Sequence, residues 1–423
     1  MSKKDMKYLQ QFNAINLKYL KQQQLDIEQI IKLKDEMLQH GFLDIYSYYM
    51  DILCDFYLLT GDVDEFCVYM NELLEIGKKT GGFPLIYALL HQGFDAWWHQ
   101  NDIGKGIEFF EDAQKTYIST GLNDPMTFLS IMQCLGAISC MIGDYKTAYH
   151  CFTKALSCKL PAIYNFKKSA TYKWLGKIEH DHHNLKQAIY YLKKSIEILK
   201  KHNQNTTICD AMNSLGDIYN QLKNYDEAFI VLSEAKELAS KCNLPAVLAD
   251  VYNNLGIGYN ETGEYQRAEE HFRKSLEHRE NQEHTLKYAM VLQNLALTFE
   301  NMKKYNQAEK FYIQALDSSE NCEYPPFTVR VLCNFGRLCL VQKRYTDALK
   351  YFQKAEKLIE TVDDSDMILM TYEHLIIYYL DKEDYKTATK YLCLHKDKAF
   401  KVYEQRLKES VEFQQIKYGE VGR

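Results

Sequence analysis

The chain has 423 residues, and its 51 Lys and Arg against 57 Asp and Glu give a net charge of −6 at pH 7. A balance so close to neutral excludes a surface dominated by nucleic-acid or anionic-membrane binding. With 19 Gly and 6 Pro, turn-forming residues have about half their usual share, which argues against an all-β fold.

Cysteine usage and hydropathy indicate the compartment. The twelve cysteines form no C-x-x-C pair, a pattern typical of small buried thiols in a reducing environment. No apolar run at the amino terminus suits a signal peptide, and no stretch of about 18 uncharged apolar residues suits a membrane span. We therefore predict a cytoplasmic protein with no membrane insertion.

The first 41 residues carry apolar side chains at helical spacing, as in Ile27, Ile30 and Met37. They stand at the phase of a degenerate repeat, so we predict that residues 1–41 form an amino-terminal capping helix pair. Two weak copies of a longer motif follow, Val63/Phe66/Met70/Leu73 and Ile103/Gly106/Phe110/Ala113.

From residue 145 this motif returns with a constant step of 40 residues. A large apolar residue opens each copy, a small one follows three positions later, and a second large apolar residue four positions after that. The copies begin at Tyr145, Leu185, Tyr225, Tyr265, Tyr305, Tyr345 and Tyr385. A Leu-Gly pair or its equivalent keeps the same step, at 135, 175, 215, 255, 295, 335 and 375. Seven copies in register predict a repeat architecture.

Both halves of each copy have the spacing of a half-buried helix, with apolar residues at i, i+3, i+4 and i+7. Small residues such as Ala268 stand where the two helices must approach closely. We predict an all-α, right-handed superhelical solenoid of about nine helix-turn-helix repeats over residues 42–395. Residues 396–423, which include Phe400 in an apolar stripe, are predicted to form a carboxy-terminal capping helix.

These repeats resemble the tetratricopeptide-repeat (TPR) family. The family pattern W-x-x-L-G-x-x-Y…A-x-x-x-F is matched best by Tyr252, Leu255-Gly256, Tyr259, Ala268 and Phe272. The 40-residue period exceeds the usual 34 and is similar to that of kinesin light chains, LGN-type polarity adaptors and bacterial peptide-pheromone receptors. The resemblance covers roughly residues 42–395, and it implies a fold that binds other proteins.

One position of the first helix, directly before the Leu-Gly pair, indicates a binding face. It holds Asn254, Asn294 and Asn334 in three successive copies. In TPR proteins that resemble this chain, Asn at this position faces the inner groove and hydrogen-bonds a bound peptide. A side-chain amide offers both the donor and the acceptor that an extended backbone needs. The alternative is an Asn that hydrogen-bonds the neighbouring repeat and only spaces the solenoid.

Further candidates for peptide binding lie around this column of Asn residues. Asn213 and Asn253 stand one position earlier in their copies. Arg330 and Arg337 share a helix face with Asn334, so their guanidinium groups could clamp a carboxylate.

Charges along the predicted groove alternate in sign. Lys173 and Lys177 form a second basic spot, whereas Asp210, Asp217 and Asp250 form an acidic stripe. This alternation favours a ligand of mixed charge, and ion pairing between repeats explains it equally well.

The sequence contains no catalytic constellation: a Gly-rich phosphate loop, G-x-S-x-G and H-E-x-x-H are all missing. The segment His180-Asp181-His182-His183 offers metal-ligand residue types. It fits a solvated turn better, because adjacent residues on a turn rarely converge on one ion. We predict no catalysis, no cofactor and no metal.

The favoured function is a non-catalytic adaptor that holds a protein or peptide segment in the concave groove and binds no nucleic acid. One alternative is a bacterial peptide-pheromone receptor similar to the Rap regulators, and another is a structural subunit gripped along its convex face. Residues 1–41 contain no recognisable DNA-recognition helix, which counts against a transcription factor. The catalytic residues of a Rap-type phosphatase cannot be matched to this sequence.

Overall fold

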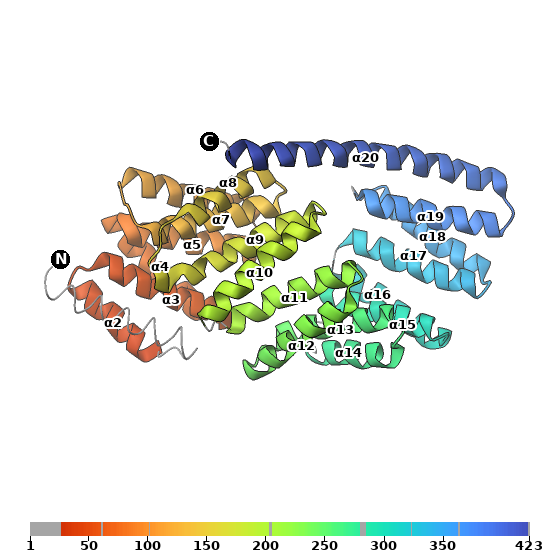
Figure 1. The fold of residues 1–423 in the computed structure, drawn as a ribbon, viewed down its shortest axis with the longest axis horizontal. Coiled ribbons are helices and arrows are strands. Elements are labelled where there is room, and N and C mark those ends of the chain that lie inside the picture. The colour runs from red at the N-terminus through yellow and green to blue at the C-terminus, as the bar shows by residue number, and fades with distance from the viewer. Residues whose placement is uncertain are drawn as a thin grey trace. The chain divides into compact units, whose positions relative to one another are not determined.

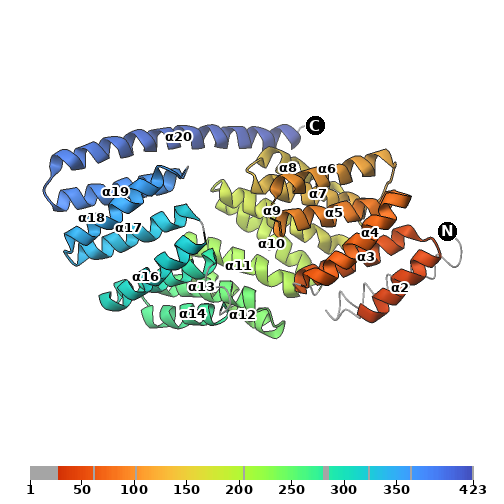
Figure 2. The same cartoon turned by 180° about the vertical axis from the view of Figure 1, so that it is seen from behind.

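The computed structural model describes residues 27–60, 62–100, 102–202, 205–279, 285–322, 324–362 and 364–421. These residues form nineteen α-helices, α2 to α20, with one short 3-10 helix, η1, and no strand among them (Figures 1 and 2). The prediction of an all-α fold is therefore confirmed. The first 26 residues of the predicted amino-terminal cap lie outside the described residues.

The chain divides into two compact units, residues 1–204 with 416–423 and residues 205–415. The first unit contains α2 (Ile27–Gln39), α3 (Leu43–Thr60), α4 (Val63–Thr80), α5 (Gly82–Trp98), α6 (Ile103–Ser119), α7 (Pro125–Met141), α8 (Tyr145–Ser157), η1 (Ala162–Lys167), α9 (Lys168–Asp181) and α10 (Leu185–Lys201).

The second unit continues with the same kind of helix pairs. It contains α11 (Asn205–Gln221), α12 (Tyr225–Lys241), α13 (Pro245–Glu261), α14 (Tyr265–Glu277), α15 (Leu286–Asn301), α16 (Tyr305–Asn321), α17 (Pro325–Val341), α18 (Tyr345–Ile359) and α19 (Ser365–Asp381), and most of α20 (Tyr385–Val421).

Consecutive helices pack as hairpins in each unit, from α3/α4 to α9/α10 in the first and from α11/α12 to α17/α18 in the second. The last pair, α19 and α20, meets through the stacked rings of Tyr379 and Tyr391, whose centroids are 5.7 Å apart. The described residues thus form nine hairpins, as predicted. The right-handed sense and the boundaries at residues 41 and 395 stay predictions, and α20 runs through residue 395 without a break.

The 40-residue step fixes where helices begin and end. From α8 onward, each second helix starts at residue 145, 185, 225, 265, 305, 345 or 385. Each partner first helix ends four residues earlier, at 141, 181, 221, 261, 301, 341 or 381. The step read from the sequence is therefore the step of the hairpins themselves.

The turn inside each of these hairpins has one residue in the left-handed region. Its φ is 79° at Gly143 and 82° at Gly263, and between 57° and 60° at His183, Lys223, Lys303, Lys343 and Glu383. The amide of the following residue closes the helix end, as when Lys304 N–H donates to the Phe299 carbonyl at 2.8 Å. Such a bond is typical of a Schellman cap, which usually has Gly at the left-handed position.

The core lies between the two helices of each hairpin and between neighbouring hairpins. The Ala residues of the motif are fully buried, as is the large residue four positions later, for example Ala268 and Phe272. A Cβ atom added at Gly256 would lie 2.6 Å from the Phe272 ring, so the glycine is required for the helices to approach. In the last copy Leu392 is 54% exposed.

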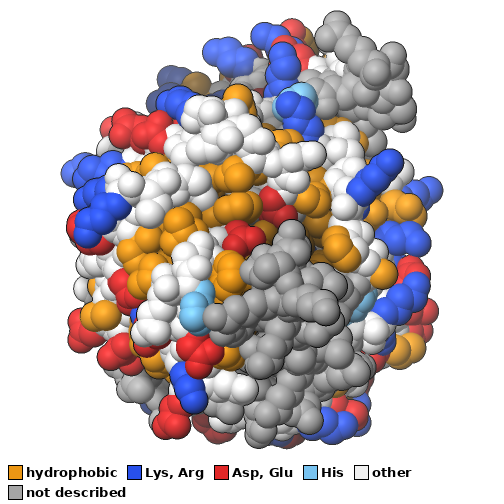
Figure 3. Space-filling model, turned by 90° about the vertical axis from the view of Figure 1, so that its left-hand side faces the viewer, with side chains coloured by type: hydrophobic (Ala, Val, Ile, Leu, Met, Phe, Trp, Pro, Cys, Tyr) orange, Lys and Arg blue, Asp and Glu red, His pale blue; other side chains and the backbone are white. Residues whose placement is uncertain are grey.

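Other features of the sequence also have simple structural counterparts. Most of the twelve cysteines are buried free thiols, and burial raises the pKa of Cys333 to about 11. Among the described helices, none combines the length and apolar character that crossing a bilayer requires. Seen from the side of the amino-terminal helices, hydrophobic side chains cross the middle of the face and Lys and Arg lie mostly near its rim (Figure 3).

Candidate functional site

The predicted Asn column lies on helices that contact one another in sequence. In the second unit the first helices of successive hairpins, α11, α13, α15, α17 and α19, each touch the next. Because they form one layer, side chains at equivalent positions on them come into line. This layer is the candidate binding face.

Four amides of this layer hydrogen-bond in series. Asn254 Nδ2 on α13 donates to Asn213 Oδ1 on α11 at 3.0 Å, and Asn294 Nδ2 on α15 donates to Asn253 Oδ1 on α13 at 3.0 Å. Asn253 Nδ2 and Asn254 Oδ1 complete the series at 3.4 Å. We call these four side chains the amide ladder. Its members pair across repeats, which is the geometry of the spacing role named as the alternative.

The amide ladder also shows which of its groups remain able to bind a ligand. Asn254 is buried, with 8% of its surface exposed, and its backbone carbonyl accepts a hydrogen bond from Asn220 Nδ2 at 2.8 Å. Asn213, Asn253 and Asn294 are half-buried. Each primary amide has two N–H donors, so the half-buried members keep donors beyond those the ladder uses. Peptide contact by these residues stays a prediction.

Arg337 is already engaged by a carboxylate of the chain. Its guanidinium on α17 donates to both oxygens of Glu300 on α15, at 2.6 and 3.0 Å. Tyr312 Oη donates to the same carboxylate at 3.2 Å, and burial together with the nearby Glu300 charge raises the pKa of Tyr312. The Glu300 side chain is 9% exposed, so this bidentate pair is largely dry on the acid side.

The amide ladder stops between α15 and α17. Asn334 is 41 positions after Gln293, the same separation that joins Asn294 to Asn253. Asn334 nevertheless makes no side-chain hydrogen bond within the described chain, and Gln293 Oε1 is buried without a partner. Arg330, one helical turn before Asn334, stacks on Phe327 at 5.8 Å and has no ion pair with a described residue.

The remaining charged candidates are distributed differently from the prediction. Lys173 and Lys177 lie on α9 in the first unit, and Lys177 Nζ contacts Asp181 at 2.8 Å. In the second unit Asp250 pairs with Arg279 and, at 2.8 Å, with Lys287. Ion pairing within the chain therefore uses Lys177 and Asp250, the bland reading of the alternating charge.

The His180–His183 segment does not gather as a metal site. His182 Nδ1 lies 2.9 Å from the carbonyl of Ile178, and the His182 ring packs edge-on against Tyr145 with 4.5 Å between centroids. His183 occupies the left-handed position of the turn. These contacts fit the turn that the sequence indicated.

Sequence reasoning missed two participants, Glu300 and Asn220. Both belong to first helices, at positions that do not repeat in residue type along the chain, so no column marked them. A usable signal was available for Glu300: it is a charged residue among the buried apolar residues at the end of α15.

The family comparison rests on these same hairpins. The sequence profile of the tetratricopeptide repeat matches residues 207–281, 247–321 and 294–361. The matches lie in the second unit, where the 40-residue step is most regular. This chain is a tetratricopeptide-repeat protein. TPRs are generally a non-enzymatic fold for protein interactions.

Solved structures share the fold at low identity. A Rap protein complexed with Competence and Sporulation Factor has a TM-score of 0.56 and 14% identity over 79% of this TPR chain and 93% of its own. The apo form of RapI has a TM-score of 0.53 and 15% identity over 76% and 99%. A STAND signal-transduction ATPase with a TPR sensor, from Pyrococcus horikoshii, has 0.56 and 16% over 82% and 54%. No curated protein matches the sequence significantly.

Proposed function

We propose that this TPR protein is a non-catalytic interaction scaffold, located in the cytoplasm, that holds an extended segment of a partner protein along the first helices of its second unit. The break in the amide ladder is the observation that carries the proposal. A buried acceptor on Gln293, an unpaired amide on Asn334 and the Arg330 guanidinium stand together on α15 and α17. Buried polar groups without partners are costly, so a peptide backbone that pairs with them would gain affinity.

The spacing of the helices suits an extended ligand. Packed helices lie about 8–10 Å apart, which is about three residues of extended chain at roughly 3.3 Å each. A strand crossing this layer would therefore meet one amide position for every three of its residues. Arg330 supplies a charge for an acidic side chain or a terminal carboxylate. The Rap structure named above holds Competence and Sporulation Factor, and this precedent on a shared fold supports a bound peptide here.

The proposal can be tested with a defined probe. Random 12-residue peptides displayed on phage are selected on the full chain, and the enriched peptides are titrated by fluorescence anisotropy. Asn334→Ala should weaken binding about two- to tenfold, because one amide-backbone bond is worth about 0.5–1.5 kcal/mol. Arg330→Ala should weaken acidic peptides most, and added salt should shrink that difference.

A matched control comes from the same helix layer. Asn301 on α15 is exposed and hydrogen-bonds Asn260 on α13 at 3.2 Å, so Asn301→Ala removes an amide away from the proposed site. That variant should bind like the parent chain. Unchanged affinity in both Asn334→Ala and Arg330→Ala, with the variants folded, would instead favour the structural subunit bound along another face.

A further inference from the structure

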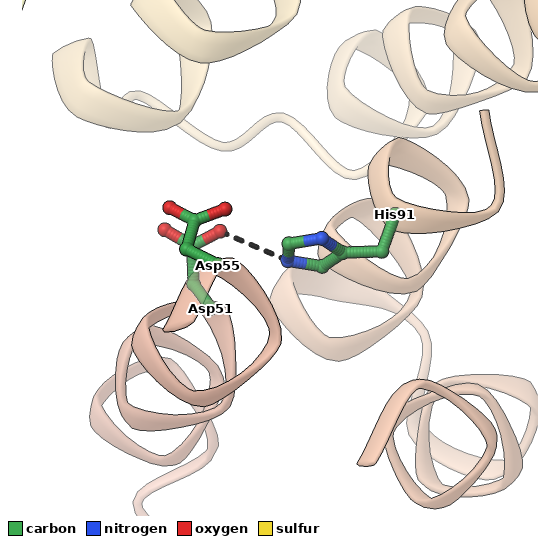
Figure 4. A group of neighbouring side chains, drawn as sticks. All are labelled: Asp51, Asp55 and His91. Carbon is green, nitrogen blue, oxygen red and sulfur yellow. Dashed lines mark hydrogen bonds and ion pairs between the residues drawn. The ribbon is translucent and has the colours of Figure 1, made fainter. Parts of the chain in front are cut away.

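Three side chains with metal-ligand chemistry meet between α3 and α5 of the first unit (Figure 4). Asp51 and Asp55 extend from α3, and His91 reaches them from α5. The candidate ligand atoms all lie within 4.8 Å of one another, and His91 Nε2 is 3.1 Å from Asp51 Oδ1. In the parts of the chain that the structure describes, no other three His, Cys, Asp or Glu residues converge in this way.

The positions of these residues in the repeat make the cluster unusual. His91 stands two residues before Gly93, which meets Phe110 as Gly136 meets Phe152. His91 thus occupies the same place on its helix as the Asn column. Asp51 and Asp55 lie four apart on one face of an otherwise apolar helix. Like charges at that spacing destabilise a helix by a few tenths of a kcal/mol, so another contribution must offset them.

The charge of the two carboxylates is incompletely balanced by the chain. His91 is 1% exposed and pairs with Asp51, but Asp55 makes no hydrogen bond or ion pair with any described residue. Asp55 is partly open to solvent, which leaves a path for an ion. Desolvation by the surrounding chain and the neighbouring Asp51 raise the pKa of Asp55 to about 6, while His91 and Lys167 lower it.

We propose that Asp51, Asp55 and His91 bind one divalent transition-metal ion of the Mn²⁺ or Zn²⁺ class. Neighbouring ligands around such an ion, with bonds of about 2.1 Å, stand about 3–3.5 Å apart. The His91–Asp51 distance already has this value, and Asp55 needs only a side-chain adjustment to join them. Two carboxylates and one imidazole suit these ions and leave further positions for water.

The site joins two neighbouring hairpins and so acts as a clip. α3 and α5 are the first helices of successive hairpins and contact each other. An ion held by both helices stabilises that contact whenever it is bound. His91 Nδ1 is buried without a hydrogen-bond partner. Without that outer contact the ion binds about 10–100-fold more weakly than at a site that has it.

The test uses Mn²⁺ alone, because Mn²⁺ prefers oxygen and nitrogen ligands and avoids competition from the twelve cysteines. The full chain is stripped with EDTA and titrated while the free Mn²⁺ signal is followed by electron paramagnetic resonance. We expect one ion per chain, a Tm that rises with Mn²⁺, and at least tenfold weaker binding in Asp55→Asn and His91→Gln.

Asp95 and His99 provide the matched control. They form another Asp–His pair in the same part of the chain, with 2.9 Å between His99 Nδ1 and Asp95 Oδ1. His99→Gln should leave Mn²⁺ affinity unchanged. Because Asp55 is exposed, Asp55→Asn should fold even where His91→Gln does not, as circular dichroism will show. The proposal is overturned by the absence of stoichiometric binding, by unchanged affinity in Asp55→Asn, or by an equal loss in His99→Gln.

Discussion

Replacing Arg337 with Gln should destabilise the second unit by about 2–3 kcal/mol. The Glu300 carboxylate is 9% exposed and receives two hydrogen bonds from Arg337. Breaking a fully buried pair from one side costs about 3–5 kcal/mol, because the remaining charge is stranded. Two features reduce that figure here: Tyr312 still donates to the acid, and the Arg337 side chain was 37% exposed.

The converse change should cost less. In Glu300→Gln the remaining charge is a half-exposed guanidinium that water can reach, so we expect a loss of about 1 kcal/mol. The double variant with Gln at both positions should be more stable than Arg337→Gln alone, because no charge is stranded. This asymmetry distinguishes a buried pair from two independent surface charges.

Urea denaturation followed by circular dichroism measures these differences at pH 7. Lowering the pH toward about 4 lets the stranded Glu300 take up a proton, so the deficit of Arg337→Gln should shrink. Arg330→Gln is the control, since Arg330 has no ion pair with a described residue, and its stability should stay within about 0.5 kcal/mol of the parent. Equal stability of the two arginine variants would refute the reasoning and return Arg337 to the role of a free ligand clamp.

Three further outcomes follow from the hairpins. Lys303→Gly should stabilise by up to about 1 kcal/mol by relieving the left-handed turn, and Gly263→Ala should destabilise by about 1–2 kcal/mol, both measured by urea denaturation. Burial lowers the pKa of His271 to about 4, below its unfolded value, so protonation favours unfolding and stability should fall as the pH drops from about 6.5 to 4; thermal melts of His271→Leu should show a flatter dependence. Asn254→Ala should cost about 1–2 kcal/mol through the amide ladder, whereas Asn334→Ala should leave the unfolding free energy nearly unchanged in the same assay.

The fold was accessible from the sequence because its determinant is periodic. Packing between helices requires a small residue opposite a large one, as at Gly256 and Phe272, and this requirement recurs at every hairpin. A 40-residue step in those residues therefore predicts the helix boundaries directly. The division into two units was not predicted, because the motif continues in register across residue 204.

The candidate site was only partly accessible. The Asn column was found by its repetition, but hydrogen bonding between Asn254 and Asn213 depends on side-chain reach across two helices, which a column does not encode. Glu300 was missed because pairing with Arg337 occurs once. The Asp51–His91 cluster lies in the early copies, where the step from residue 103 to 145 is 42 rather than 40, so the alignment of columns hid it.

The constant step also has a genetic consequence, because recombination between copies can remove one hairpin without shifting any other. Loss of residues 265–304, a span of 40, would place Asn334 opposite Asn253 at the separation that Asn294 now has. Glu300 would leave with the deleted hairpin, so Arg337 would remain as an exposed cation with no stranded acid. Homologous chains that differ in length should therefore differ by whole multiples of the step, and their ligand preferences should change one hairpin at a time.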